Sequence, residues 1–192
     1  MGKYHEGLRG FFKDIDDNVK AEKNSHRKAI LDNYLKHAAL EYTDRWKEIF
    51  DPVRTVAHPV YKVRWGTDED VIYDGPDAVQ GFYRTLKDDT FLTNQDQLLA
   101  VNDWGFTSFL KIILHMNAEK ARREGFEVDD DSAQYALETP CAMYWLYDDK
   151  AKLIGEYVYE IGKSTYSKTA PSDVITDEDV QEIVAPYLPP VS

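Results

Sequence analysis

The clearest pattern of apolar and polar positions lies between Ala29 and Phe50 and has the spacing of an amphipathic helix. Apolar side chains recur there at intervals of three and four residues, which places them on one stripe of a helix. At 3.6 residues per turn, this helix has about six turns. We expect it to end at Asp51-Pro52, because proline lacks a backbone donor and clashes with the preceding turn. The stripe consists of Leu31, Leu35, Ala38, Tyr42, Trp46 and Ile49.

After this helix the pattern changes to the alternation of apolar and polar residues that is typical of β-strands. A second helix is expected over residues 77–87. Thr176 with Asp179 forms a capping box for a short helix that ends before Pro186. Residues 118–134 are rich in charge and are expected to form a loop, or a short helix followed by a loop. The predicted strands cover residues 60–65, 71–73, 97–101, 105–117, 135–147 and 151–164.

This order of elements divides the chain into three parts. They are an N-terminal arm over residues 1–28, a main domain over residues 29–165 and a C-terminal strap with a short helix over residues 166–192. In the main domain the strands follow the helices as a block, which predicts an α+β domain. We expect a curved sheet, mixed or antiparallel, that packs on the N-terminal helices and leaves an internal cavity. The arm and the strap would clasp a partner chain or close the mouth of the cavity.

Composition narrows the function classes. The net charge is −12 and the sequence pI is about 4.8, so the phosphate backbone of a nucleic acid would be repelled. The single cysteine, Cys141, excludes an internal disulfide and a multi-cysteine zinc site. No apolar run approaches the roughly 18 residues of a membrane span, and the N-terminus has no apolar signal-peptide core. We therefore expect a soluble, cytoplasmic protein without membrane or nucleic-acid partners.

Three stretches resemble the nuclear transport factor 2-like superfamily, which includes ketosteroid isomerase, scytalone dehydratase, limonene epoxide hydrolase and the SnoaL-like polyketide cyclases. They are residues 42–50, residues 60–65 and residues 73–83. Within the last stretch, the run from Gly75 to Phe82 is similar to the superfamily pattern G-x-x-A-[IV]-x-x-[FY]. The resemblance covers roughly residues 29–163. It implies a cone-shaped fold, but this fold hosts many activities.

The dehydratase branch of this superfamily uses a tyrosine and an aspartate of the first helix together with histidines of the sheet. The resemblance implies that Tyr42 and Asp44 are this pair and that His115 is one of the histidines. In this chain Thr43 separates Tyr42 from Asp44, and a second sheet histidine has no counterpart. Asp44 also lies off the apolar stripe. It points to solvent if the helix continues, and inward if the helix breaks near Thr43; both alternatives stay open.

Two histidines in apolar surroundings are candidates for proton transfer. His58 precedes Pro59 in an otherwise apolar run, and a neutral imidazole there can exchange a proton near pH 7. The alternative is a histidine that bonds to a loop carbonyl. His115 lies within Ile112–Met116 and is expected to be desolvated. The alternative for His115 is a satisfied histidine of the core.

Aromatic residues supply the expected binding surface. Their faces suit a hydrophobic substrate and stabilise a carbocation-like transition state. The alternative is that many of them belong to the core or to a dimer interface. The expected substrate-binding residues are Tyr61, Trp65, Tyr83, Trp104, Phe109 and Trp145.

Known cofactor motifs are missing from the sequence. It has no P-loop, no Rossmann fingerprint, no G-x-S-x-G and no H-E-x-x-H, and its acidic runs lack the spacing of an EF-hand. We therefore expect neither cofactor nor metal.

The expected function is that of a cofactor-independent lyase or isomerase that opens a terpenoid epoxide, with Tyr42, Asp44, His58 and His115 as catalytic residues. The alternatives are a dehydratase or polyketide cyclase of the same fold, or a non-catalytic module that binds a ligand. The strand over residues 105–117 is apolar on both faces, and for this reason a homodimer is expected.

Overall fold

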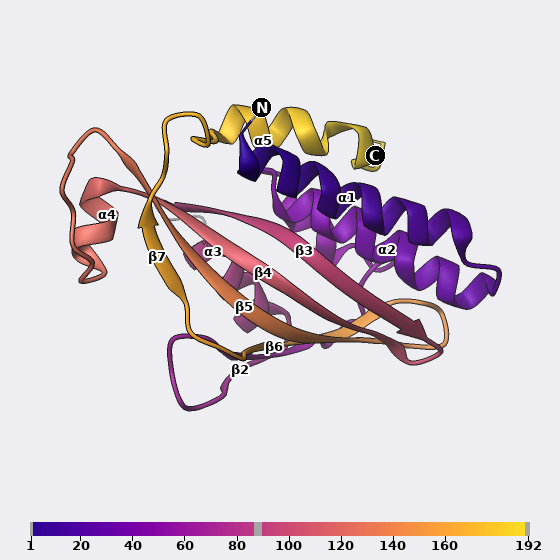
Figure 1. The fold of residues 1–192 in the computed structure, drawn as a ribbon. Coiled ribbons are helices and arrows are strands. Elements are labelled where there is room, and N and C mark those ends of the chain that lie inside the picture. Colours follow the sequence, from indigo (N-terminus) through magenta and orange to yellow (C-terminus); the bar gives the residue numbers. More distant parts are fainter. Residues whose placement is uncertain (1, 87–89, 191–192) are drawn as a thin grey trace.

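The computed structural model describes residues 2–86 and 90–190, and its centre is one curved, open β-sheet (Figure 1). The described strands follow the order β2-β1-β6-β5-β4-β3, and β7 pairs with β5 beside this path. The β1–β6 pair is parallel and the other pairs are antiparallel, so the sheet is mixed. The strands are β1 Val60–Arg64, β2 Val71–Asp74, β3 Thr90–Asn102, β4 Gly105–Asn117, β5 Gln134–Tyr147, β6 Leu153–Glu160 and β7 Thr165–Lys168.

Helices cover one face of this sheet, as the sequence predicts for an α+β domain. Figure 1 shows α1 and α2 side by side along the long strands, with α5 beyond α1 and α4 at one end of the sheet. The fold class predicted from the sequence is therefore confirmed. The helices are α1 Lys3–Ala21, α2 Ser25–Glu41, α3 Pro76–Leu86, α4 Ala118–Arg123 and α5 Asp177–Val184, with short 3₁₀ helices η1 Trp46–Phe50 and η2 Ala185–Tyr187.

The two faces of the sheet have different surroundings because successive side chains of a strand point to opposite sides. Ile112, Trp145 and Glu156 point toward the helices. On the other face Leu98 is 71% exposed, and it pairs directly with Phe109, which is 42% exposed. Tyr144, 43% exposed, lies on the same outer face in the next strand. The inner face therefore builds the core, and the outer face presents large apolar side chains to solvent.

Helix α2 ends earlier than the apolar stripe predicts. It ends at Glu41, and η1 begins at Trp46. Between them, the hydroxyl of Thr43 donates to the carbonyl of Leu40 at 3.0 Å and accepts from the backbone N–H of Arg45 at 3.2 Å. A threonine hydroxyl that bonds to nearby backbone groups competes with the helical hydrogen bonds. The break at Thr43 is therefore real, and a single helix to Phe50 is wrong.

Other elements show where local sequence patterns predict the structure correctly and where they do not. β4 coincides with the predicted strand over residues 105–117, and the capping box of Thr176 with Asp179 starts α5. The predicted strand over residues 97–101 is only the end of β3, whose first half is polar and whose register shifts between Gln95 and Leu98. The predicted strand over residues 151–164 is shorter in the structure, where β6 ends at Glu160, and β7 begins only at Thr165, beyond the predicted bounds.

The N-terminal arm is an integral helix of the core. Its apolar side is buried at Tyr4, Leu8, Phe11, Phe12 and Ile15. The ring of Phe12 stacks on Tyr187 of the C-terminal segment at 5.0 Å between centroids and meets the edge of Tyr42 at 5.7 Å. The two terminal segments are thus joined to each other and to the end of α2 through this aromatic contact.

Replacing Phe12 by alanine tests this role of the arm. A buried phenylalanine that becomes alanine costs about 3–5 kcal/mol, because apolar contact is lost and a cavity remains. We expect Phe12→Ala to lower the free energy of unfolding by this amount in urea titrations followed by circular dichroism. Arg9→Ala, on the exposed side of α1, should change it by less than about 0.5 kcal/mol. Equal effects of the two variants would contradict a core role for α1.

Candidate active site

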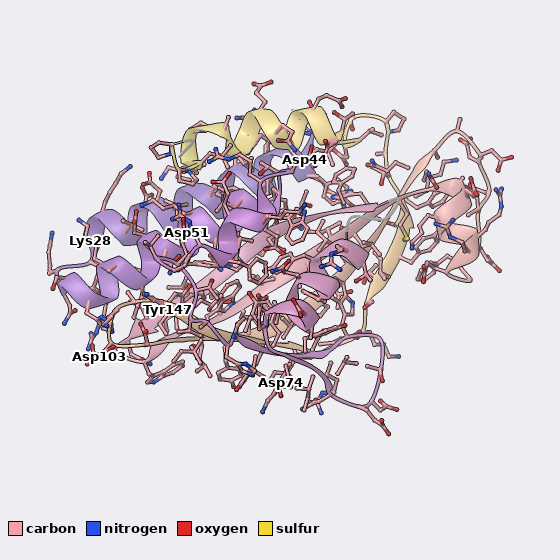
Figure 2. All side chains as sticks on the ribbon, turned by 180° about the vertical axis from the view of Figure 1, so that it is seen from behind. Lys28, Asp44, Asp51, Asp74, Asp103 and Tyr147 are labelled. Atoms are coloured by element: carbon pink, nitrogen blue, oxygen red, sulfur yellow. The ribbon has the colours of Figure 1, made fainter. Side chains whose placement is uncertain are left out.

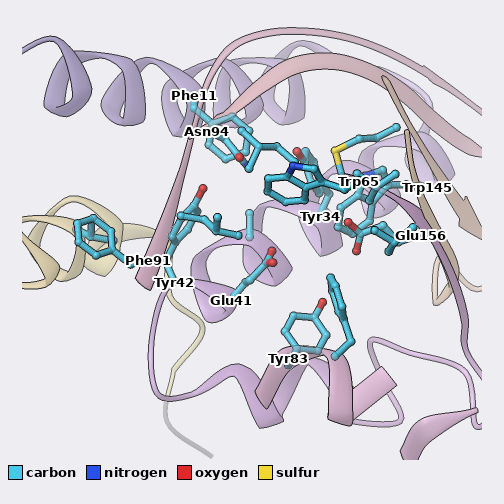
Figure 3. Close-up of a pocket in the computed structure, with 18 of the residues that line it drawn as sticks. Phe11, Tyr34, Glu41, Tyr42, Trp65, Tyr83, Phe91, Asn94, Trp145 and Glu156 are labelled. Atoms are coloured by element: carbon cyan, nitrogen blue, oxygen red, sulfur yellow. The ribbon is translucent and has the colours of Figure 1, made fainter. Parts of the chain in front are cut away.

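A cavity lies between the inner face of the sheet and the helices (Figure 3). The volume of the cavity that the centre of a water molecule can occupy is about 70 Å³. A single water needs only about 10–15 Å³ by the same measure. Its wall is mainly aromatic and aliphatic, which suits a small apolar ligand. The lining residues are Phe11, Tyr34, Ala38, Glu41, Tyr42, Val63, Trp65, Phe82, Tyr83, Phe91, Leu92, Asn94, Ile112, Met143, Trp145, Glu156, Val158, Asp177 and Val180.

Two carboxyl groups enter this cavity from opposite walls. Glu41 is the last residue of α2, and Glu156 comes from β6, where it pairs directly with Trp145 of β5. Figure 3 shows both side chains pointing into the cavity. Glu156 is only 5% exposed, and its Oε2 has no hydrogen-bond partner among the described residues. The site therefore contains a desolvated carboxyl group beside a second one.

Burial decides the protonation of Glu156. Loss of hydration, and then repulsion by Glu41, raise the pKa of Glu156 well above its ordinary value of 4.5. Both causes disfavour the charged carboxylate. Two carboxyl groups in one apolar site hold a single proton over a wide pH range, because the second charge is too costly. Burial thus favours the neutral, protonated form of Glu156 beside a second carboxyl group, Glu41.

A chain of buried polar groups fixes the hydroxyl of Tyr83 at the cavity wall. His37 Nε2 lies 2.9 Å from Tyr83 Oη, which lies 3.2 Å from Tyr61 Oη. Desolvation, with a smaller effect of the nearby Arg54, lowers the pKa of His37 to about 3, so the imidazole is neutral. The phenol of Tyr83 is therefore held by two neutral partners and is available to bond a polar group of a ligand.

The structure brings several of the predicted site residues together. Tyr42, Trp65, Tyr83 and Trp145 all line the cavity. Tyr61 is buried behind them and reaches the site through the hydroxyl of Tyr83. The part of the prediction that placed aromatic side chains around a pocket thus agrees with the geometry.

The predicted acid–base residues do not meet in this cavity. Asp44 is exposed even though the helix breaks at Thr43. The side chain of His58 is 68% exposed, and its Nε2 lies 2.8 Å from Asp74 Oδ1. Figure 2 shows Asp44 beside α5 and Asp74 at the opposite side of the molecule. The structure therefore does not bring Asp44 and His58 together, and their catalytic roles stay predictions.

His115 is buried outside the cavity. Its Nε2 lies 2.8 Å from Thr93 Oγ1, and its ring lies between Tyr4 and Phe91 at centroid distances of 4.7 and 4.8 Å. Desolvation lowers its pKa to about 3. His115 and Asp44 both line a second, open groove beside the cavity. The geometry of His115 agrees with the alternative of a core histidine, while a role in the groove stays a prediction.

Two predicted binding residues lie away from the cavity. Trp104 is exposed in the turn between β3 and β4, and Phe109 lies on the outer face of β4. Phe109 has the opposite phase to Leu110 and Ile112, which point inward. An apolar side chain in a strand that is apolar on both faces does not reveal which face is the inner one. Trp104 and Phe109 are therefore not part of the cavity wall.

The sequence interpretation missed Glu41 and Glu156. Both had a detectable signal. Glu41 follows Ala38 by three positions and so borders the apolar stripe of α2, and Glu156 has the same phase as Val158 in β6. An acidic residue in phase with a buried pattern marks a group that is desolvated on folding.

Neither a metal site nor a membrane span is found in the described residues. No group of three His, Cys, Asp or Glu side chains among them is placed to hold a metal ion. In the same residues, every helix is too short or too polar to cross a lipid bilayer.

Comparison with known proteins identifies the fold. No protein-family model matches the chain, and no significant match is found among curated proteins. Among solved structures, a provisionally named polyketide cyclase from Xanthomonas campestris pv. campestris superposes with a TM-score of 0.51 at 13% identity. The match covers 71% of this chain and 93% of that one.

Two further structures are less similar. A provisionally named SnoaL-like polyketide cyclase from Jannaschia sp. CCS1 has a TM-score of 0.46 at 9% identity, covering 72% of this chain and 89% of that one. SalBIII, an epoxide hydrolase/cyclase-like enzyme of pyran ring formation in salinomycin, has a TM-score of 0.41 at 14% identity. The match covers 70% of this chain and 89% of that one. These two likenesses are too loose to bear on function.

The chain thus has an α+β fold with a curved, open mixed sheet and N-terminal helices, which is consistent with the cone fold that its sequence resemblance predicts. At 13% identity the likeness shows the fold alone. None of the three structures is named as a terpene epoxide lyase, so the expected opening of a terpenoid epoxide has no support from them.

The protonation of Glu156 can be tested through stability. A carboxyl group whose pKa is raised on folding binds more protons in the folded state, so stability falls as the pH rises from about 4.5 toward the folded pKa. The slope has an upper limit of about 1.4 kcal/mol per pH unit. Glu156→Gln removes this group, and we expect the variant to lose less stability than the parent between pH 5 and pH 8 in urea titrations.

Glu160→Gln is the matched control, because it changes the same charge on the same strand outside the cavity. Its pH profile should follow that of the parent. A parent-like slope in Glu156→Gln would show that Glu156 is ionised in the folded protein.

Proposed function

We propose that the protein is a cofactor-independent enzyme that performs acid–base chemistry on a small, largely apolar molecule in the cavity. The observation that carries this proposal is the pairing, inside an aromatic wall, of Glu156, whose neutral form is favoured by burial, with a second carboxyl group, Glu41. Such a pair supplies a general acid and a general base at the same pH.

The reaction class that suits this pair is enolisation followed by ring closure. The carboxylate of Glu41 removes a proton from a carbon next to a carbonyl group, and the electron pair of the C–H bond moves into the enolate. The enolate carbon then attacks a second carbonyl of the same molecule, and a C–C bond forms. The resulting alkoxide takes the proton of Glu156. The pair thus ends with its proton moved from Glu156 to Glu41, and exchange with water restores the starting state.

Tyr83 would bond to the enolate oxygen in this scheme. Its hydroxyl is positioned by His37 and Tyr61, and a fixed donor aimed at a developing negative charge lowers the barrier. The provisional name of the Xanthomonas structure, a polyketide cyclase, agrees with this reaction class. Opening of a terpenoid epoxide or removal of water would use the same acid and base on a different substrate.

Proton exchange at carbon tests the chemistry without knowledge of the substrate. We expect the protein to accelerate deuterium uptake next to the carbonyl of cyclohexanone or 2-tetralone in D₂O, measured by proton NMR. Glu41→Gln should lower this rate by about 10²-fold or more, the usual contribution of a general base. Glu156→Gln should have a smaller effect, because exchange alone forms no alkoxide for Glu156 to protonate.

The controls separate this site from the residues predicted first. Asp44→Asn, His58→Ala and Glu160→Gln should keep the rate of the parent. If Asp44→Asn or His58→Ala abolishes exchange and the cavity variants do not, the acid and base are elsewhere. If the parent is inactive on every ketone, epoxide and hydroxylated ring offered, a binding module replaces the enzyme.

We further propose a homodimer that is formed through the outer face of the sheet. Leu98, Phe109 and Tyr144 place large apolar side chains together on that face. Lys62 and Arg64 lie over the rings of Tyr157 and Tyr159 next to them, at 4.7 and 5.0 Å from the ring centroids. An apolar patch with a polar rim is typical of a protein interface.

Light scattering during gel filtration tests the dimer. The parent chain has a mass of 22.2 kDa, and we expect twice this mass in solution. Phe109→Lys should shift the protein to the monomer, because a charge in the centre of an apolar interface is desolvated without a partner. Val53→Lys changes an exposed residue away from the sheet and should leave the mass unchanged. A monomeric parent would contradict the proposal.

A further inference from the structure

We propose that the ligand of the cavity is a small organic cation, a protonated or alkylated amine on an apolar skeleton. This inference rests on the proposed function, because it names the substrate class of the same site. It arises from the balance of charge in the cavity, which the acid–base scheme by itself does not use.

The ionisable groups of the cavity wall all have the same sign. Glu41, Glu156 and Asp177 line it, and no lysine, arginine or histidine is among the described lining residues. Asp177, the first residue of α5, also lines the open groove next to the cavity. A molecule that enters from this groove therefore passes one carboxylate and reaches two more carboxyl groups.

The inner carboxyl group has unused hydrogen-bonding capacity. Oε2 of Glu156 is buried without a partner among the described residues. Burial and the nearby Glu41 raise its pKa, and no cation appears among the causes. A buried polar atom without a partner costs free energy, and an ammonium group, which carries donors only, supplies the missing bond. This atom, and not the number of acidic residues, indicates a ligand.

The aromatic wall favours the same chemistry. Trp65, Tyr83 and Trp145 line the cavity, and Trp145 is the direct cross-strand neighbour of Glu156. Aromatic faces attract cations, most strongly tryptophan and in desolvated sites. The apolar skeleton of the amine would contact Ile112, Val158 and the other aliphatic groups of the wall.

The charges then balance. The pair of Glu41 and Glu156 with one proton carries one negative charge, and a monocation makes the site neutral while Glu156 keeps the proton that the reaction uses. An anionic ligand would add a second negative charge to an apolar cavity. The net charge of −12 attracts cations to the molecule as a whole.

Two molecules with the same skeleton separate charge from shape. We would titrate the parent protein with 2-phenylethylammonium and with 2-phenylethanol by isothermal calorimetry at pH 7 and low salt. The amine should bind at least about tenfold more tightly, which corresponds to about 1.4 kcal/mol. In Glu41→Gln, which leaves Glu156 as the single carboxyl group of the pair, this preference should fall to about threefold or less, whereas Glu160→Gln should keep it.

A second variant guards against misfolding of the first. Trp145→Leu should weaken the amine more than the alcohol, because it removes an aromatic face while the apolar volume is partly kept. Urea titrations would show that both variants are folded.

The outcomes are distinct. If the alcohol binds as tightly as the amine, the amine proposal is overturned, while the cavity and its acid–base pair stand. If neither molecule binds, the amine proposal is again overturned, and the deuterium-exchange assay decides separately whether the proposed function survives. A preference for the amine that persists unchanged in both Glu41→Gln and Trp145→Leu would place the cation elsewhere on the acidic surface.

Discussion

Two carboxyl groups share one apolar cavity in this protein, and the low polarity around them allows the pair only one charge. Glu156 is desolvated by the sheet and the helices, and Glu41 repels any charge that would form on it. In the proposed function, this constraint favours Glu156 as the acid and leaves Glu41 as the base. It also explains why the aromatic wall matters, since each ring that excludes water from the cavity strengthens the electrostatic interaction of the two groups.

The pair depends on contacts that are distant in the sequence. Glu156 is positioned by its register with Trp145 across β5 and β6, and β6 is in turn held by β1 through a parallel pairing. Glu41 reaches the cavity because α2 ends there, and the end of α2 is determined by the side-chain bonds of Thr43. The aromatic contact between Phe12 and Tyr187 brings the terminal helices over the same end of α2. The site therefore depends on the pairing of β6 with β5 and β1, on the helix end at Thr43, and on the stacking of Phe12 on Tyr187.

These constraints explain how much could be predicted from sequence. β4 and the capped start of α5 follow from local patterns, strand alternation and a capping box, and both are predicted with their correct bounds or start. The fold class follows from the order of the elements. Phe109 is misplaced, and the sequence leaves the orientation of Asp44 open, because these orientations depend on which face of a strand is covered and on what happens after a helix breaks. Those are properties of the tertiary structure.

The two carboxyl groups that the sequence interpretation missed also depend on the tertiary structure. Glu41 and Glu156 look like ordinary surface charges unless the phase of each residue is compared with its apolar neighbours, because acidic residues are seldom buried. Histidines attract attention for their pKa near neutrality, yet His115 and His37 are so strongly desolvated that both are neutral over the physiological range.

In this fold the group best suited to proton transfer near pH 7 is thus a glutamate and not a histidine. Burial moves the pKa of a carboxyl group upward, toward neutrality, and moves that of an imidazole downward, away from it. A deep apolar cavity therefore selects carboxyl groups for its acid–base chemistry, and the same burial that costs stability at Glu156 makes the residue useful.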